Sequence, residues 1–143
     1  MNQKRIDELI PVALALLKNP QPGFKEIMLD NNKIKSSYAG AIDAFGPTVI
    51  QSGLAKTLAF YMKESEETNR RAILELIKEV MKKNYSMKPE YNSKNLLEIY
   101  IEETKNKSTL EKLRFRDRLL EAYIACKFAK LCFEKVEPKY EEE

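Results

Sequence analysis

The sequence predicts an all-α fold, a compact single-domain bundle of about five to six helices. A length of 143 residues suits one domain. Only 4 Gly and 6 Pro occur, whereas a β-sandwich would need many turn signals. Apolar residues recur at helical spacing, so the 33% of charged residues do not indicate disorder. We expect residues 1–136 to form the bundle domain and residues 137–143 to form an acidic C-terminal tail.

The first predicted helix covers residues 2–18. Apolar residues from Ile6 to Leu17 recur at i, i+3 and i+4 spacing, which places them on one helical face. Pro11 falls inside this run, so a kink or a helix start is expected near it. The sequence Asn-Pro-Gln-Pro-Gly at residues 19–23 must end the helix.

The central stretch, residues 38–62, is the most apolar part of the chain. Before it, residues 24–29 are expected to form one helical turn, and residues 30–32 form a turn or cap cluster. Inside the stretch, Gly46-Pro47 and Ser52-Gly53 interrupt the helical pattern. We therefore predict two packed helices with a tight joint, and not a catalytic loop.

Three further helices are predicted after the central stretch. A capping Ser followed by two Glu residues indicates a helix over residues 65–85. Residues 86–93 lack periodicity and are predicted as a loop, and a short helix follows over residues 93–105. The last helix covers residues 108–135 and begins with a Ser and a Glu at capping-box spacing.

The last helix has two apolar faces when successive residues are placed roughly 100° apart. One face contains Leu110, Leu113, Leu120, Ile124, Phe128 and Leu131. The other contains Phe115, Leu119, Ala122, Cys126, Ala129 and Phe133. A helix that is apolar on two sides packs on two sides, so it is either the central helix of the bundle or a helix shared with a partner protein.

Between these two faces runs a row of four cations and one aromatic ring, formed by Lys112, Arg116, Tyr123, Lys127 and Lys130. No carboxylate lies among them. Such a row can neutralise phosphates and offer a ring for base stacking. Spacing alone favours a simpler interpretation, a solvated surface whose Lys and Arg stems cover apolar neighbours.

The residue types present argue against an enzyme and against a metal site. The chain has no His, the commonest general base and metal ligand, so no catalytic residue, metal or cofactor is predicted. Cys126 and Cys132 are expected to be buried apolar residues in a reducing cytoplasm. No membrane span or signal peptide is evident, so a cytoplasmic location is predicted. The net charge of +3 does not by itself indicate nucleic acid.

One motif in the central stretch points to a family. A Tyr is followed by a helix-initiating Pro and then by Ile-x-x-Gly-Leu-x-x-x-Leu-Ala-Phe, at positions Tyr38, Ala41, Pro47, Ile50, Gly53, Leu54, Leu58, Ala59 and Phe60. The stretch resembles the Cmr small-subunit family of type III-B CRISPR effector complexes. We interpret the motif positions as packing residues that set the shape of the bundle.

This resemblance implies a non-catalytic helical subunit that stacks with copies of itself along an effector complex. It also implies contacts with other Cmr subunits and with the phosphates of guide and target RNA, without sequence specificity. Combined with the helical positions, it leads us to expect RNA contact at Lys112, Arg116, Tyr123, Lys127 and Lys130. The alternative is a helical protein-binding adaptor with no nucleic-acid contact. A DNA-binding regulator is disfavoured, because the helix after Gly53 is strongly apolar.

Overall fold

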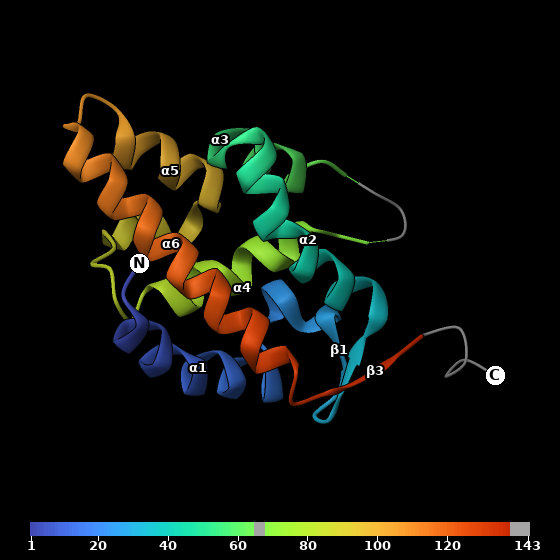
Figure 1. Ribbon diagram of the computed structural model, residues 1–143. Coiled ribbons are helices and arrows are strands. Elements are labelled where there is room, and N and C mark those ends of the chain that lie inside the picture. Colours follow the sequence, from blue (N-terminus) through green and yellow to red (C-terminus); the bar gives the residue numbers. More distant parts are fainter. Residues whose placement is uncertain (65–67, 138–143) are drawn as a thin grey trace.

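A computed structural model of the chain describes residues 1–64 and 68–137 (Figure 1). These residues form six α-helices, two short 3₁₀ helices and one three-stranded sheet. In chain order the elements are α1 (Gln3–Lys18), η1 (Pro22–Ile27), β1 (Met28–Asp30), β2 (Lys33–Lys35), α2 (Ser36–Ser52), α3 (Leu54–Tyr61), α4 (Arg71–Met81), η2 (Pro89–Ser93), α5 (Leu96–Thr104), α6 (Thr109–Lys130) and β3 (Glu134–Val136). The predicted helical bundle is confirmed.

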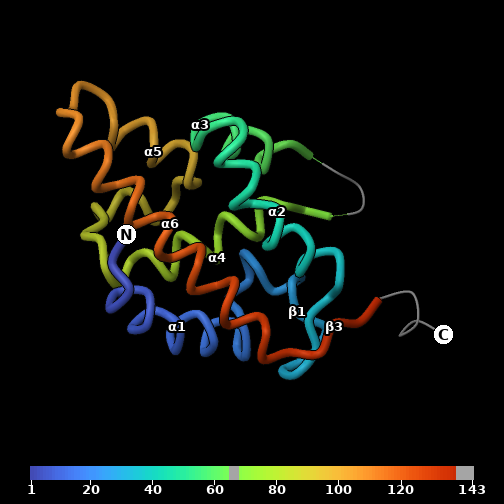
Figure 2. Tube along the Cα trace, viewed as in Figure 1, coloured from blue at the N-terminus to red at the C-terminus, as the bar shows by residue number. Residues whose placement is uncertain are grey.

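Helix α6 is the central element. It packs against α1, α2, α4 and α5, and Figure 2 shows its orange-to-red trace crossing the molecule in front of α4. The predicted capping box is present: the Ser108 hydroxyl accepts from the Glu111 amide at 3.2 Å, and the Glu111 carboxylate accepts from the Ser108 amide at 3.3 Å. One predicted apolar face is buried through Phe115, Leu119, Ala122, Cys126, Ala129 and Phe133.

Helix α1 begins and ends where the sequence predicts. The Asn2 side chain accepts a hydrogen bond from the Arg5 amide at 3.1 Å and caps the first turn. The helix continues through Pro11 to Lys18. After it, η1 is a short helical turn as expected, but it covers residues 22–27 and not 24–29, because Met28 and Leu29 belong to β1. Its buried residues Phe24 and Ile27 belong to the core.

The joint in the central stretch lies at Gly53 and not at Gly46-Pro47. Helix α2 continues through both residues, which corrects the prediction of a break there. Because Pro47 has no N–H, the carbonyl of Asp43 loses its donor within the helix. The Tyr123 hydroxyl of α6 donates to that carbonyl at 3.5 Å. Gly53 has a φ of +88°, a conformation that favours glycine, and it turns the chain into α3.

Helix α4 is shorter than predicted. It begins at Arg71, and the predicted start at residues 65–67 lies outside the described residues. The apolar residues that recur along it at helical spacing are buried, namely Ile73, Leu76, Ile77, Val80 and Met81. Lys78 is also buried, and its ammonium donates to the carbonyls of Asn92 at 3.2 Å and Lys94 at 2.6 Å. These bonds hold η2, a helix within the predicted loop, against α4.

A small sheet is the main difference from the predicted fold. Strands β1 and β2 form an antiparallel hairpin, and β3 pairs with β2 in parallel. The hairpin turn follows Asp30, whose carboxylate accepts from the Asn32 amide at 2.7 Å, so the predicted turn is correct. The predicted end of the last helix at residue 135 is wrong, because the chain leaves α6 after Lys130 and extends into β3.

Glu121 of α6 joins three parts of the fold. Its buried carboxylate accepts from the Arg5 guanidinium at 2.8 and 2.9 Å and from the Asn2 amide at 2.9 Å. Arg118 and Asn84 lie farther away, at 3.8 and 3.4 Å. Burial acts to raise the pKa of Glu121, but the hydrogen bonds outweigh burial and the pKa is lowered.

We predict that Glu121→Gln lowers the free energy of unfolding by about 1–3 kcal/mol at neutral pH, because Gln cannot replace both charge-assisted bonds. Since the folded-state pKa of Glu121 is lowered, its contribution is present above the unfolded value of about 4.3 and is lost as the pH falls through the folded value. Denaturant unfolding at several pH values should therefore show that the free energy of unfolding falls less on acidification in the variant than in the wild type. Glu8→Gln, at an exposed position of α1, is the control and should change little. Equal stability of Glu121→Gln and wild type would contradict the conclusion that the charged hydrogen bonds of Glu121 stabilise the fold.

The two glycines inside α2 should respond oppositely to alanine. A Cβ at Gly40 meets no atom within 4 Å, whereas a Cβ at Gly46 would lie 3.0 and 3.1 Å from the Tyr123 ring and hydroxyl. Gly40→Ala should stabilise the protein by about 0.5–1 kcal/mol through helix propensity. Gly46→Ala should destabilise it, because Tyr123 is buried and cannot withdraw. Thermal unfolding of both variants measures the difference, and a stabilising Gly46→Ala would show that Tyr123 does not confine this position.

Candidate nucleic-acid and protein interface

Three of the five residues predicted to contact RNA lie on the surface. Lys112, Arg116 and Lys127 are exposed on α6 and make no ion pair within the part of the chain that the structure describes. We call these three residues the cation row. Tyr123 and Lys130 each expose only 3% of their surface, so the structure separates them from the row.

Tyr123 is a packing residue. Its ring centroid lies 4.9 Å from that of Phe45, and its hydroxyl reaches the Asp43 carbonyl of α2. Burial raises the pKa of its phenol, as expected for a side chain removed from water. The expectation that Tyr123 offers a ring for base stacking is therefore wrong in this fold.

Lys130 is neutralised by α2. Its ammonium lies 2.9 Å from a carboxylate oxygen of Asp43, and its side chain is buried. The helical positions suggested a row free of carboxylates, but they could not show that Asp43 approaches from another helix. Lys130 thus joins α6 to α2 through the partly exposed carboxylate of Asp43, and its buried side chain is not available to a phosphate.

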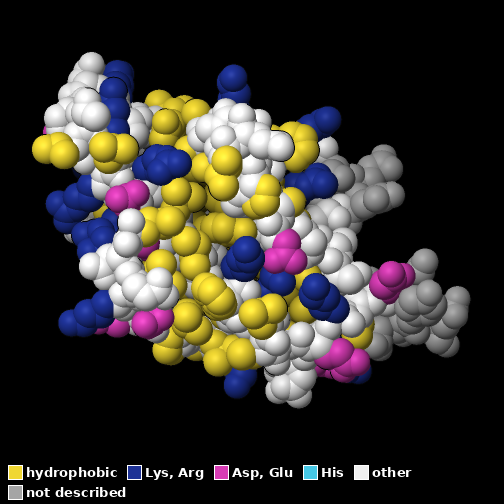
Figure 3. All heavy atoms as spheres, viewed as in Figure 1, with side chains coloured by type: hydrophobic (Ala, Val, Ile, Leu, Met, Phe, Trp, Pro, Cys, Tyr) yellow, Lys and Arg dark blue, Asp and Glu magenta, His cyan; other side chains and the backbone are white. Residues whose placement is uncertain are grey.

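The second predicted apolar face of α6 is exposed at both ends, whereas Leu120 is buried and Ile124 is half-buried between them. Leu110 and Leu131 expose 79% and 67% of their surface, and Leu113 and Phe128 are also exposed. We call these four residues the outer face of α6. Figure 3 shows apolar side chains gathered over the front of the molecule, where α6 lies in Figure 1, with Lys and Arg side chains among them. Leu110 and Leu113 lie near the start of the helix, and Phe128 and Leu131 lie at its end, about 22 Å away at 1.5 Å per residue. Exposed apolar surface of this kind is typical of protein contact sites.

The motif residues of the central stretch divide between core and surface. Tyr38, Leu54 and Leu58 are buried, as a packing role requires. Pro47, Ile50, Ala59 and Phe60 are exposed, so the interpretation as packing residues is wrong for these four. Gly53 is also exposed, but it sets the turn from α2 into α3 and so shapes the bundle as expected. The resemblance therefore includes a surface of α2 and α3 as well as the core beneath it.

A polar cavity of about 220 Å³ lies between α5 and the start of α6, lined by Tyr85, Ser86, Glu103, Lys107, Glu111 and Arg114. The hydroxyls of Tyr85 and Tyr91 donate to the Glu103 carboxylate at 2.5 and 2.7 Å. Burial acts to raise the pKa of Glu103, but these two bonds outweigh it and the pKa is lowered. Glu103 is therefore a paired carboxylate that ties the loop around η2 to α5, and it is poorly suited to act as a general base.

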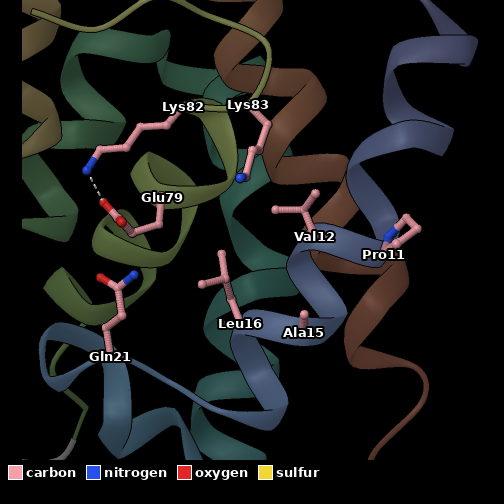
Figure 4. A pocket seen from close by; sticks show the side chains of 8 residues that line it. All are labelled: Pro11, Val12, Ala15, Leu16, Gln21, Glu79, Lys82 and Lys83. Carbon is pink, nitrogen blue, oxygen red and sulfur yellow. Dashed lines mark ion pairs between the residues drawn. The ribbon is translucent and has the colours of Figure 1, made fainter.

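A second cavity, a groove of about 600 Å³, lies between α1 and the end of α4 (Figure 4). It is lined by Pro11, Val12, Ala15, Leu16, Gln21, Glu79, Lys82 and Lys83. Figure 4 shows Lys82 turned away from α1 toward Glu79, and the two charges lie 2.6 Å apart. The groove wall on α1 is apolar, so its chemistry suits an apolar side chain better than a reacting group.

The two cysteines differ in environment. Cys126 is buried as expected, and burial raises the pKa of its thiol, which disfavours the reactive thiolate. Cys132 is exposed, which corrects the prediction that both are buried. Over residues 1–64 and 68–137 no cluster of three or more potential metal ligands occurs, and no helix is long and apolar enough to cross a membrane.

Comparison with known proteins identifies the chain. A family model described as "CRISPR-associated protein (Cas_Cmr5)" matches residues 24–130, which span η1 to the last residue of α6. No curated protein and no solved structure matches the chain. The matched segment contains the central stretch, the cation row and most of the outer face of α6. The chain belongs to the CRISPR-associated Cas_Cmr5 family, the small subunits of type III-B Cmr complexes.

Proposed function

We propose that this Cmr subunit is non-catalytic and joins neighbouring parts of the complex through one side of α6. The observation that carries the proposal is the arrangement of that helix: four exposed apolar residues, Leu110, Leu113, Phe128 and Leu131, share its surface with the cation row. Apolar contact supplies affinity for neighbouring protein subunits, including further copies of the chain. The cations attract the phosphates of guide and target RNA without reading sequence.

The spacing of the cation row supports contact with an extended polyanion. Lys112 and Arg116 are one helical turn apart, and Lys127 lies about 16 Å farther along the helix at 1.5 Å per residue. A helix of this length can therefore follow several phosphates of one strand. Because none of the three side chains is paired within the described residues, all three charges are free to release counterions on binding.

The proposal that the subunit does not catalyse a reaction is supported by the side chains available. The sequence has no His. Of the groups that could replace it, Glu103 is held by two tyrosine hydroxyls and Cys126 is buried with a raised pKa. Within the Cmr complex, this subunit would position RNA and neighbouring proteins, and catalysis would occur on other subunits.

A protein-binding adaptor without RNA contact is the second candidate. It is favoured by one observation: the fold removes Tyr123 and Lys130 from the predicted RNA surface and leaves Leu110, Leu113, Phe128 and Leu131 exposed. The two candidates differ in what the cation row does, so RNA binding separates them.

Replacing Lys112, Arg116 and Lys127 together by Gln should weaken binding of single-stranded RNA to the full chain. The slope of log K against log salt should fall by about 2, or about 0.7 for each lost phosphate contact. Fluorescence anisotropy at several salt concentrations measures the slope. Gln at the exposed position Lys4 of α1 is the control and should leave the slope unchanged. An unchanged slope in the triple variant would exclude the cation row and favour the adaptor.

Charge placed on the outer face of α6 should prevent incorporation into the Cmr complex. Phe128→Glu with Leu131→Glu should co-purify poorly with the other subunits, because two carboxylates would be buried without partners at the contact. The folded monomer should keep its melting temperature, since both side chains are exposed. Ile101→Glu, at an exposed apolar position of α5, is the matched control. Normal incorporation of the double variant would place the protein contact elsewhere.

A further inference from the structure

We propose that the bend between α2 and α3 is a second RNA-binding site, which accepts one nucleotide of a single strand with its base stacked on Phe60. A cleft of about 380 Å³ opens at this bend, lined by Thr48, Ser52, Lys56 and Phe60. We call it the elbow cleft. The inference rests on the RNA binding proposed above, but it uses other residues and a different kind of contact.

The backbone explains why these four residues meet. Thr48 and Ser52 are four residues apart on α2, and Lys56 and Phe60 are four apart on α3, so each pair lies on one helical face. Gly53, with its φ of +88°, bends the chain between the two helices. The bend turns the two faces toward one shared cleft, with hydroxyls on one wall and an ammonium and a ring on the other.

The polar groups of the cleft suit a phosphate and a ribose. Lys56 is exposed and makes no ion pair within the described residues, and none of the four lining residues is a carboxylate. The Thr48 hydroxyl donates to the Ala44 carbonyl at 2.7 Å, so its oxygen is left to accept, for example from a ribose hydroxyl. The Ser52 hydroxyl can donate to a phosphate oxygen.

Phe60 offers an exposed aromatic ring for base stacking, which the buried Tyr123 does not. Phe60 is 49% exposed, and the Arg70 guanidinium carbon lies 5.4 Å from its ring centroid. An exposed ring with a cation close to it is the arrangement by which single strands are bound through stacking, because every base has a π-face. An acidic peptide could pair with Lys56, but it would gain little from the ring. The ring and the cleft volume therefore favour a nucleotide.

The test compares two variants of the full chain in anisotropy titrations with a short oligouridylate and a short oligoadenylate. Phe60→Leu keeps an apolar side chain and removes the π-face, so affinity should fall about tenfold with the salt slope unchanged. Lys56→Gln should lower the slope by about 0.7. Phe60→Tyr keeps the ring and should bind like the wild type, so it is the matched control for stacking, and Lys4→Gln is the control for the charge.

The outcomes separate this site from the cation row. If the triple cation-row variant weakens binding while Phe60→Leu binds like the wild type, the elbow cleft is overturned and the proposed function stands. If Phe60→Leu weakens binding while the triple variant does not, the elbow cleft stands and the cation row is overturned. If Lys56→Gln weakens RNA binding and Phe60→Leu does not, the cleft is an anion site without base stacking, and the nucleotide assignment is overturned. Absence of RNA binding by the wild-type chain at low salt overturns both.

Discussion

The structure depends on how α6 is fixed to α2. Pro47 leaves the Asp43 carbonyl without a helical donor, and Gly46 leaves room above it, so the Tyr123 side chain can lie against α2 with its hydroxyl on that carbonyl. Two turns later, Lys130 pairs with the side chain of the same Asp43. A Gly-Pro pair breaks a helix in most contexts. Here α2 continues through Gly46 and Pro47, and α6 packs against it at this point. Together with the packing of α6 on α1 and α4, this attachment sets which side of α6 remains exposed.

The same attachment decides which charges of α6 are available. Glu121, Tyr123 and Lys130 are turned inward and have partners on α1 and α2. Their burial is tolerable only because each polar group is satisfied. Lys112, Arg116 and Lys127 remain outside beside apolar residues that no described part of the chain covers. Internal attachment and the external binding that we propose thus use different residues of one helix.

The sequence predicted the helices well, because local signals determine them. Ser108 with Glu111 and Asn2 with Arg5 are contacts within one turn, so their residue types are sufficient evidence. The sheet was beyond such reasoning, since each strand has three residues and β3 pairs with a strand about a hundred positions earlier in the chain. Lys130 was misjudged for the same reason: a helical projection shows direction around one axis, but Asp43 comes from another helix.

The apolar residues of the central stretch show a further limit of sequence patterns. Leu54 and Leu58 are in the core, whereas Ile50 and Phe60, within the same motif, are exposed. Periodicity alone cannot separate residues that pack inside a chain from residues that face outward, because both are apolar and both recur at helical spacing. For α3 the bend at Gly53 decides, since it sets which side of that helix meets the core. A motif recognised through packing residues therefore describes two surfaces at once, one facing the core and one facing outward, and the second carries the groups available to RNA or protein.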